Sequence, residues 1–209
     1  MAKPTYKVWV VNQITLGTKI EDPTNSSYYF TWDQAKLDKV VSELKALFDE
    51  VCKHANSKFG DSSVESKDLA TVAGNIKDGH LLVRLTRATK TDSAIVKKHG
   101  QTGGNGNTVD TGGSGVISEA WLESAAGGAN HGELIARLAF HELMHNKLDA
   151  AANAPMTDMH TEDGTGLAVS PPPDENKIKY DTALSAKNKA NMAPKLGSIV
   201  QQFTGSSIP

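Results

Sequence analysis

The sequence predicts a single α+β domain, and three observations predict this class. Three segments rich in β-branched and aromatic residues, 6–16, 80–89 and 116–122, have the composition of strands. Residues 31–60 and a segment that begins near residue 130 instead repeat apolar residues at helical spacing. At 209 residues, the chain is long enough for one domain with a sizeable core.

The first strand and the first helix have clear signals. Residues 6–16 are predicted to form a strand, and the polar residues 18–27 are predicted to form a loop. Thr31 and Gln34 have the spacing of a capping box, which predicts that a helix begins here. The apolar stripe of this helix, which continues to Gly60, includes Leu37, Val40, Val41, Leu44, Leu47, Phe48, Val51, Cys52, Ala55 and Phe59.

The middle of the chain has weaker patterns. Residues 62–76 are predicted to hold a short helix. In the strand of residues 80–89, Arg84 and Thr86 alternate with apolar residues, which predicts that they lie on the wetter face of the sheet. Between residues 100 and 115, seven of sixteen positions are glycine. Such a segment has too little apolar surface to offset the entropy cost of ordering, so we expect a mobile loop.

A second amphipathic helix follows the strand of residues 116–122. Asn130 and Glu133 have the spacing of a helix cap. The stripe that follows, at alternating spacings of four and three residues, is Leu134, Leu138, His141, His145 and Leu148. Two histidines therefore continue an apolar stripe, where an imidazole without a partner is costly to bury.

Residues 141–145 read His-Glu-Leu-Met-His, which is an H-E-x-x-H motif. Helix positions four apart differ by about 40° around the axis, so His141 and His145 are expected to reach one ion. Glu142 projects about 100° from His141, beside the ion, where a carboxylate can act as a general base. Chance gives about 0.01 such motifs in a chain of this composition, so a zinc site is favoured over two surface histidines.

The motif and the order of the predicted elements resemble the zincin metallopeptidases. Zincins combine a mixed sheet, a backing helix and an H-E-x-x-H helix in one catalytic lobe, and residues 6–150 are similar to that lobe in element order. The resemblance implies that His141 and His145 bind Zn²⁺ and that Glu142 is the catalytic base. It also implies that the edge strand before the motif helix, here residues 116–122, aligns an extended peptide by β-strand addition.

The third zinc ligand is not fixed by the motif. Metzincins have glycine three residues after the second histidine and His or Asp three residues later, but this chain has Leu148 and Ala151 there. The chain is therefore metzincin-like with a non-standard spacing, and His160, the only histidine downstream of the motif, is the expected ligand. The alternatives, all of which offer zinc a carboxylate oxygen, are Asp149, Glu162 and Asp163.

Two residues further along the chain gain a role from the same resemblance. Residues 191–194 and the apolar segment after them are similar to the methionine turn of metzincins, with Met192 beneath the metal. Tyr180, the only tyrosine downstream of the motif, is expected to donate a hydrogen bond to the oxyanion. Core packing is the alternative for both side chains. Residues 185–203 are predicted to form one or two short helices around Pro194.

The expected function is zinc-dependent endopeptidase activity in one domain. We expect an upper lobe over about residues 1–150 and a smaller lower lobe, irregular or helical, over about residues 151–209. A zincin-like protein that binds metal without cutting, and a zinc amidase that acts on a non-protein amide, are the alternative functions. The expected partner is a protein or peptide substrate, and the chain is expected to be a monomer.

Charge and cysteine content exclude other classes. The 22 basic and 24 acidic residues give a net charge of −2, without the basic field of nucleic-acid-binding proteins. Cys52 is the single cysteine, so it is expected to be buried and no disulfide or thiolate zinc site can form within the chain. No membrane span or signal peptide is visible. Because a free protease is hazardous in the cytoplasm, we expect a secreted effector exported without a visible signal, with a cytoplasmic location as the alternative.

Overall fold

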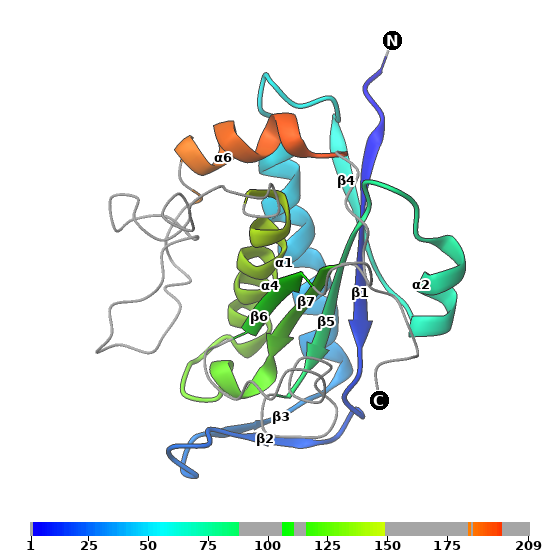
Figure 1. Ribbon diagram of the computed structural model, residues 1–209. Helices are drawn as coiled ribbons and strands as arrows, with labels where there is room; N and C mark the ends of the chain where they lie inside the picture. Colours follow the sequence, from blue (N-terminus) through cyan, green and yellow to red (C-terminus); the bar gives the residue numbers. More distant parts are fainter. Residues whose placement is uncertain (1, 88–105, 111–115, 149–183, 185, 198–209) are drawn as a thin grey trace.

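The computed structural model describes residues 2–87, 106–110, 116–148, 184 and 186–197. Within them, five strands form one sheet with helices on both faces, and a short hairpin lies beyond one end of the sheet (Figure 1). The mixed α and β composition expected from the sequence is confirmed.

The sheet is parallel except at one edge. In spatial order it contains β4 (Asp61–Ser66), β1 (Thr5–Asn12), β5 (Leu81–Thr86), β7 (Val116–Trp121) and β6 (Gly106–Asp110). The first four strands run parallel, and β6 is antiparallel to β7. Strand β1 is therefore an inner strand, and β4 and β6 are the two edges of the described sheet.

Strand β1 shows why the sheet needs helices on both faces. Its residues alternate between the two sides, and Val8 and Val10 enter the main core while Trp9 and Val11 enter a second apolar cluster. Helix α2 (Leu69–Asn75) contributes Val72 to this second cluster and covers that face (Figure 1). A nearly continuous run of buried residues in β1 is the pattern of a parallel strand with both faces covered.

Helix α1 (Gln34–Cys52) is shorter than predicted at both ends. Its N-cap is Asp33, whose carboxylate accepts a hydrogen bond from the Lys36 N–H at 2.9 Å. Thr31, the predicted cap, instead ends strand β3 (Tyr29–Thr31), which pairs with β2 (Lys19–Glu21) in a hairpin. The predicted loop at residues 18–27 therefore contains a strand, because pairing with β3 supplies hydrogen bonds that local composition does not indicate.

Two further strands lie where the sequence predicts other structures. Strand β4 occupies the start of the segment predicted as a short helix, and only α2 confirms a helix there. Strand β6 lies within the glycine-rich segment 100–115, so the prediction of a mobile loop is wrong for residues 106–110. Both strands form because a neighbouring strand pairs with them, β1 in the first case and β7 in the second.

Two predictions about the inner strands are also wrong. Arg84 and Thr86 do not mark a wetter face, because all six residues of β5 are buried. Strand β7 is not an edge strand, because it pairs with β5 on one side and with β6 on the other. The edge strand on this side of the sheet is β6, which precedes β7 in the sequence.

Helix α4 (His131–Leu148) packs against α1 on the other face of the sheet from α2 (Figure 1). Phe140 of α4 meets Phe48 of α1 in an edge-on contact with ring centroids 5.0 Å apart. Helix α6 (Ala186–Met192) and the 3-10 turn η3 (Ala193–Lys195) confirm short helices around Pro194. Among the helices of the described residues, none is both long and apolar enough to cross a membrane.

Candidate functional site

The H-E-x-x-H motif lies in the second half of α4, so the helical context that gives the motif its meaning is present. Positions 141 and 145 are one turn apart on the same face of this helix. His141 is partly exposed, whereas Glu142 is only 5% exposed. Leu143 and Met144, between Glu142 and the second histidine, are fully buried in the main core. The motif therefore lies at a boundary between core and surface.

Strand β7 and helix α1 hold α4 in place. The Ser118 hydroxyl, buried on β7, donates a hydrogen bond to the Glu142 carbonyl oxygen at 3.4 Å. At the other end of the helix, a Cβ at Gly132 would lie 2.9 Å from the Lys36 carbonyl oxygen and 2.8 Å from the Lys39 Cβ. Glycine therefore permits the first turn of α4 to approach α1 closely, which fixes the direction in which the motif is presented.

The first turn of α4 carries a histidine outside the motif. His131 stacks on Phe30 of the hairpin, with ring centroids 4.2 Å apart and an interplanar angle of 21°. Burial lowers the pKa of His131, and the nearby positive charge of Lys36 lowers it further. This histidine is therefore held by packing and lies more than two helical turns from the motif.

A buried group of charged residues lies on the face of the sheet that α2 covers. Arg84 is 2% exposed and lies opposite Glu119, which is fully buried, in the register of β5 and β7. The Trp121 indole N–H donates to the Glu119 carboxylate at 3.3 Å. Burial lowers the pKa of Arg84, and the nearby Glu119 opposes that shift.

A partly buried ion pair follows these strands in the chain. Arg87, just after β5, forms an ion pair with Glu123 at 2.7 Å, and Glu123 lies in the 3-10 turn η2 (Leu122–Ala125) after β7. No local pattern in the sequence indicates that Arg84 lies near Glu119 or that Arg87 lies near Glu123. The spacing of Arg84 and Glu119 becomes meaningful only when β5 and β7 are known to be neighbours.

The structure covers part of the predicted site. His141 and Glu142 lie side by side in α4, whereas the side chain of His145 lies outside the described residues. The remaining predicted site residues, namely His160, Tyr180, Asp149, Glu162 and Asp163, also lie outside them. Within the described part of the chain, no group of three or more His, Cys, Asp or Glu residues is placed to hold a metal ion.

Two predictions about the surrounding core can be examined directly. Cys52 is buried, as expected, and burial raises the pKa of its thiol to about 12. A protonated thiol in the core is not a metal ligand. Met192 is fully buried in the main core, and α6, which it ends, lies next to α4 and α1. Core packing of Met192 is established, and its position relative to a metal stays a prediction.

Comparison of the chain with protein families, with curated proteins and with solved structures found no match. The residues of the chain itself therefore carry the functional proposal. The H-E-x-x-H sequence, its helical position and the burial of Glu142 are the three observations available for it.

Proposed function

We propose that this protein is a zinc-dependent metalloendopeptidase of the zincin type. The observation that carries the proposal is the position of the H-E-x-x-H motif in helix α4, which gives residues 141 and 145 one common face. The sheet, the backing helix α1 and the motif helix α4 are the elements that a zincin-like catalytic lobe requires. In this proposal His141 and His145 are zinc ligands and Glu142 is the general base.

The donor set suits a catalytic zinc site. Imidazole and carboxylate are zinc ligands, and the one thiol of the chain is buried in α1 away from the surface. When bound, zinc lowers the pKa of water and polarises the carbonyl of a substrate. Glu142 takes the proton of the attacking water and passes it to the leaving amine. Because Glu142 is almost fully buried, its charge acts in a low-dielectric setting.

The rest of the proposed site comes from the chain after α4. His160 is the proposed third ligand, with Asp149, Glu162 and Asp163 as its competitors. Tyr180 is proposed to donate a hydrogen bond to the oxyanion. An extended peptide substrate would pair with β6, because β6 and not β7 is the edge of the described sheet on this side.

Metal content and one variant of Glu142 test the proposal together. The purified protein is expected to contain about one zinc per chain by elemental mass spectrometry, and to cleave members of a quenched fluorescent peptide library. Glu142→Gln removes the base, so cleavage is expected to fall by about 10²- to 10⁴-fold while zinc remains bound. Glu133→Gln, a carboxylate change in the first turn of the same helix, is the matched control.

The outcomes of this test separate the alternative functions. Full cleavage by Glu142→Gln would contradict the proposal. Zinc without any cleavage would favour a metal-binding protein without proteolytic activity. Digestion of a bacterial cell-wall preparation, with casein and the peptide library left intact, would favour an amidase that acts on a non-protein amide.

A histidine series identifies the ligands. His141→Ala is expected to lower zinc affinity by at least tenfold, as the loss of a direct ligand should, whereas His131→Ala in the same helix is expected to retain zinc. His160→Ala is expected to behave like His141→Ala. If His160→Ala retains zinc and Asp149→Ala, Glu162→Ala or Asp163→Ala does not, the third ligand is that carboxylate.

Localisation follows from the same proposal. An exported protease is expected in the medium of cells that express the untagged chain at its native level, and its recovery only from cytosol would contradict export. The expectation of an exported effector depends on the proteolytic activity and fails with it.

A further inference from the structure

The outer edge of strand β4 carries backbone groups that turn away from the sheet. Among the described strands, β4 pairs with β1 alone. The Lys67 N–H donates to the Val10 carbonyl oxygen at 3.0 Å. Since alternate residues of a parallel strand bond to the same neighbour, Val64 and Ser66 turn their N–H and C=O groups toward the open edge.

A contact from α1 agrees with this alternation and limits the open section. Ser62, Val64 and Ser66 are alternate residues of β4, so their backbone groups point in the same direction. The Ser62 N–H donates to the Asp49 carboxylate of α1 at 2.7 Å. The Ser62 hydroxyl donates to the same carboxylate oxygen at 2.7 Å. Helix α1 therefore closes the edge at Ser62, and no described residue bonds the outward backbone groups over residues 64–66, which we call the open section.

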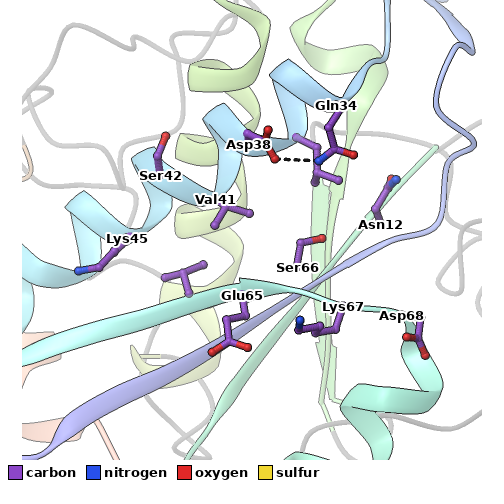
Figure 2. A pocket seen from close by; sticks show the side chains of 12 residues that line it. Asn12, Gln34, Asp38, Val41, Ser42, Lys45, Glu65, Ser66, Lys67 and Asp68 are labelled. Atoms are coloured by element: carbon purple, nitrogen blue, oxygen red, sulfur yellow. Dashed lines mark hydrogen bonds between the residues drawn. The ribbon is translucent and has the colours of Figure 1, made fainter.

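A groove of about 790 Å³ follows the open section between α1 and β4 (Figure 2). Leu37 and Val41 of α1 and Val64 of β4 give it an apolar floor. Figure 2 shows Asp38, Ser42 and Lys45 along α1 above β4, on whose edge Ser66 lies. A volume of this size lies within the range of ligand sites in proteins.

Three charged residues that line the groove, namely Asp38, Lys67 and Asp68, form no ion pair with a described residue, and of the two acids Asp68 already caps helix α2 by accepting hydrogen bonds from Thr71. Lys45 forms an ion pair with Asp49 at 2.6 Å, and Glu65 pairs with Lys7. Asp38 accepts a hydrogen bond from the uncharged Gln34 amide at 2.7 Å and forms no ion pair with any described residue. A cationic side chain is the group that complements Asp38 beside the apolar Val41.

We propose that this groove binds an extended segment of a partner polypeptide by β-strand addition to β4, with a lysine or arginine of the segment directed to Asp38. The added strand pairs with the N–H and C=O groups of Val64 and Ser66. Its alternate side chains face α1, where the aliphatic part of the basic residue covers Val41. The site lies on the opposite edge of the sheet from β6 and is independent of the proposed zinc chemistry.

Binding of a peptide library to the full chain tests the proposal. The probe is a positional-scanning library of fluorescent, unstructured decapeptides, used with a chelator so that cleavage cannot remove them. We expect the retained peptides to share Lys or Arg at one position. N-methylation of a retained peptide, residue by residue, is expected to weaken binding at alternate positions only, because only alternate amides face β4. No retained peptide, or equal sensitivity at every position, would overturn the proposal.

Variants of β4 and α1 tie the binding to this groove. Ser66→Pro removes an outward N–H that β1 does not use, and proline is tolerated on edge strands in this way. It is expected to weaken binding about five- to tenfold, the effect of one hydrogen bond, whereas Ser66→Ala keeps the N–H and is expected to bind normally.

The role of Asp38 is tested by a separate variant, so that the result does not depend on how well Ser66→Pro folds. Asp38→Asn is expected to weaken binding about tenfold and to remove the preference for Lys or Arg. Thermal unfolding measured alongside checks that each variant keeps its fold. Unchanged binding in Asp38→Asn, or in a folded Ser66→Pro, would overturn the proposal.

Discussion

Helices α1 and α4 pack side by side against the same sheet, but their buried sides differ in chemistry. The buried residues of α1 are six large apolar side chains and Cys52. Helix α4 buries the carboxyl side chain of Glu142, which follows the partly exposed His141 and precedes the fully buried Leu143 and Met144. Burying a polar side chain costs stability unless it is hydrogen-bonded, and an apolar residue would close the core without that cost. Helix α1 therefore acts through packing, whereas α4 also carries a polar side chain into the core, and in the proposed function this side chain is the general base.

The largest expected effect tests the packing role of α1. Phe48→Ala should lower the free energy of unfolding by about 3–5 kcal/mol, because Phe48 is fully buried between the rings of Tyr6 and Phe140. Denaturant titration of the purified variant measures this. Ser42→Ala, on the exposed side of α1, is the control and should stay within about 0.5 kcal/mol of the parent. A loss below about 1 kcal/mol in Phe48→Ala would mean that α1 is not the packing helix.

A smaller effect concerns how α1 begins. Asp33→Ala removes the side chain that caps the Lys36 N–H, and should cost about 1 kcal/mol in the free energy of unfolding. Asp33→Asn keeps a capping oxygen and should cost much less. If the two variants are equally destabilised, the ion pair between Asp33 and Lys36, and not the cap, stabilises the helix start.

The smallest effect depends on pH and concerns two partly buried histidines, His131 in the first turn of α4 and His80 directly before β5. The pKa values of His131 and His80 are both lowered, chiefly by burial, so the folded chain favours the neutral imidazoles. Their contribution to stability is complete above the ordinary value of 6.5 and is lost as pH falls below it. The melting temperature should therefore fall between pH 7.5 and pH 5.5.

The double variant His131→Asn with His80→Asn checks the assignment. Asparagine does not titrate, and at position 80 it can accept the hydrogen bonds that the Trp9 indole and the Lys77 N–H donate to the His80 Nδ1. Its melting temperature should change less over this pH range than that of the parent. An equal change in both proteins would show that other groups cause the dependence.

The elements that the sequence predicts well are those whose pattern is set by burial. Seven of the stripe residues from Leu37 to Cys52 are buried in α1, and the strands over residues 5–12, 81–86 and 116–121 lie within about four residues of the predicted ends. In these segments, local propensity and the hydrophobic pattern indicate the same structure. The helix–strand order of this part of the chain was therefore largely predictable.

The missed elements owe their structure to a partner strand. Strand β4 contains one apolar residue, Val64, and becomes a strand because β1 offers it a ladder of hydrogen bonds. Strand β6 is mostly polar, lies within the glycine-rich segment 100–115, and forms against β7. The alternation in residues 80–89 predicts that Arg84 faces solvent, because no local pattern indicates that Glu119 lies opposite it. The hydrophobic pattern of a segment predicts which of its residues are buried. It does not predict which distant segment will pair with it as a strand.

The candidate site also has one part that the sequence predicts and one part that it does not. His141 and Glu142 belong to one short motif in one helix, and their relation follows from helix geometry alone. A third ligand has no fixed spacing from that helix, so the choice among His160, Asp149, Glu162 and Asp163 stays a prediction. The groove beside β4 was missed because β4 itself was missed.

The inner position of β1 has a consequence for how the chain folds during synthesis. Strand β1 leaves the ribosome before its two partners, β4 and β5, which are about 50 and 75 residues further along the chain. At about 5–20 residues per second, roughly 3–10 s pass before β4 exists and several more before β5 does. During this time the apolar residues of β1, Val8 to Val11, have no sheet to join. Helix α1, whose contacts are local, can form in the interval and cover Val8 and Val10, whereas Trp9 and Val11, on the other face of β1, stay uncovered until α2 is made.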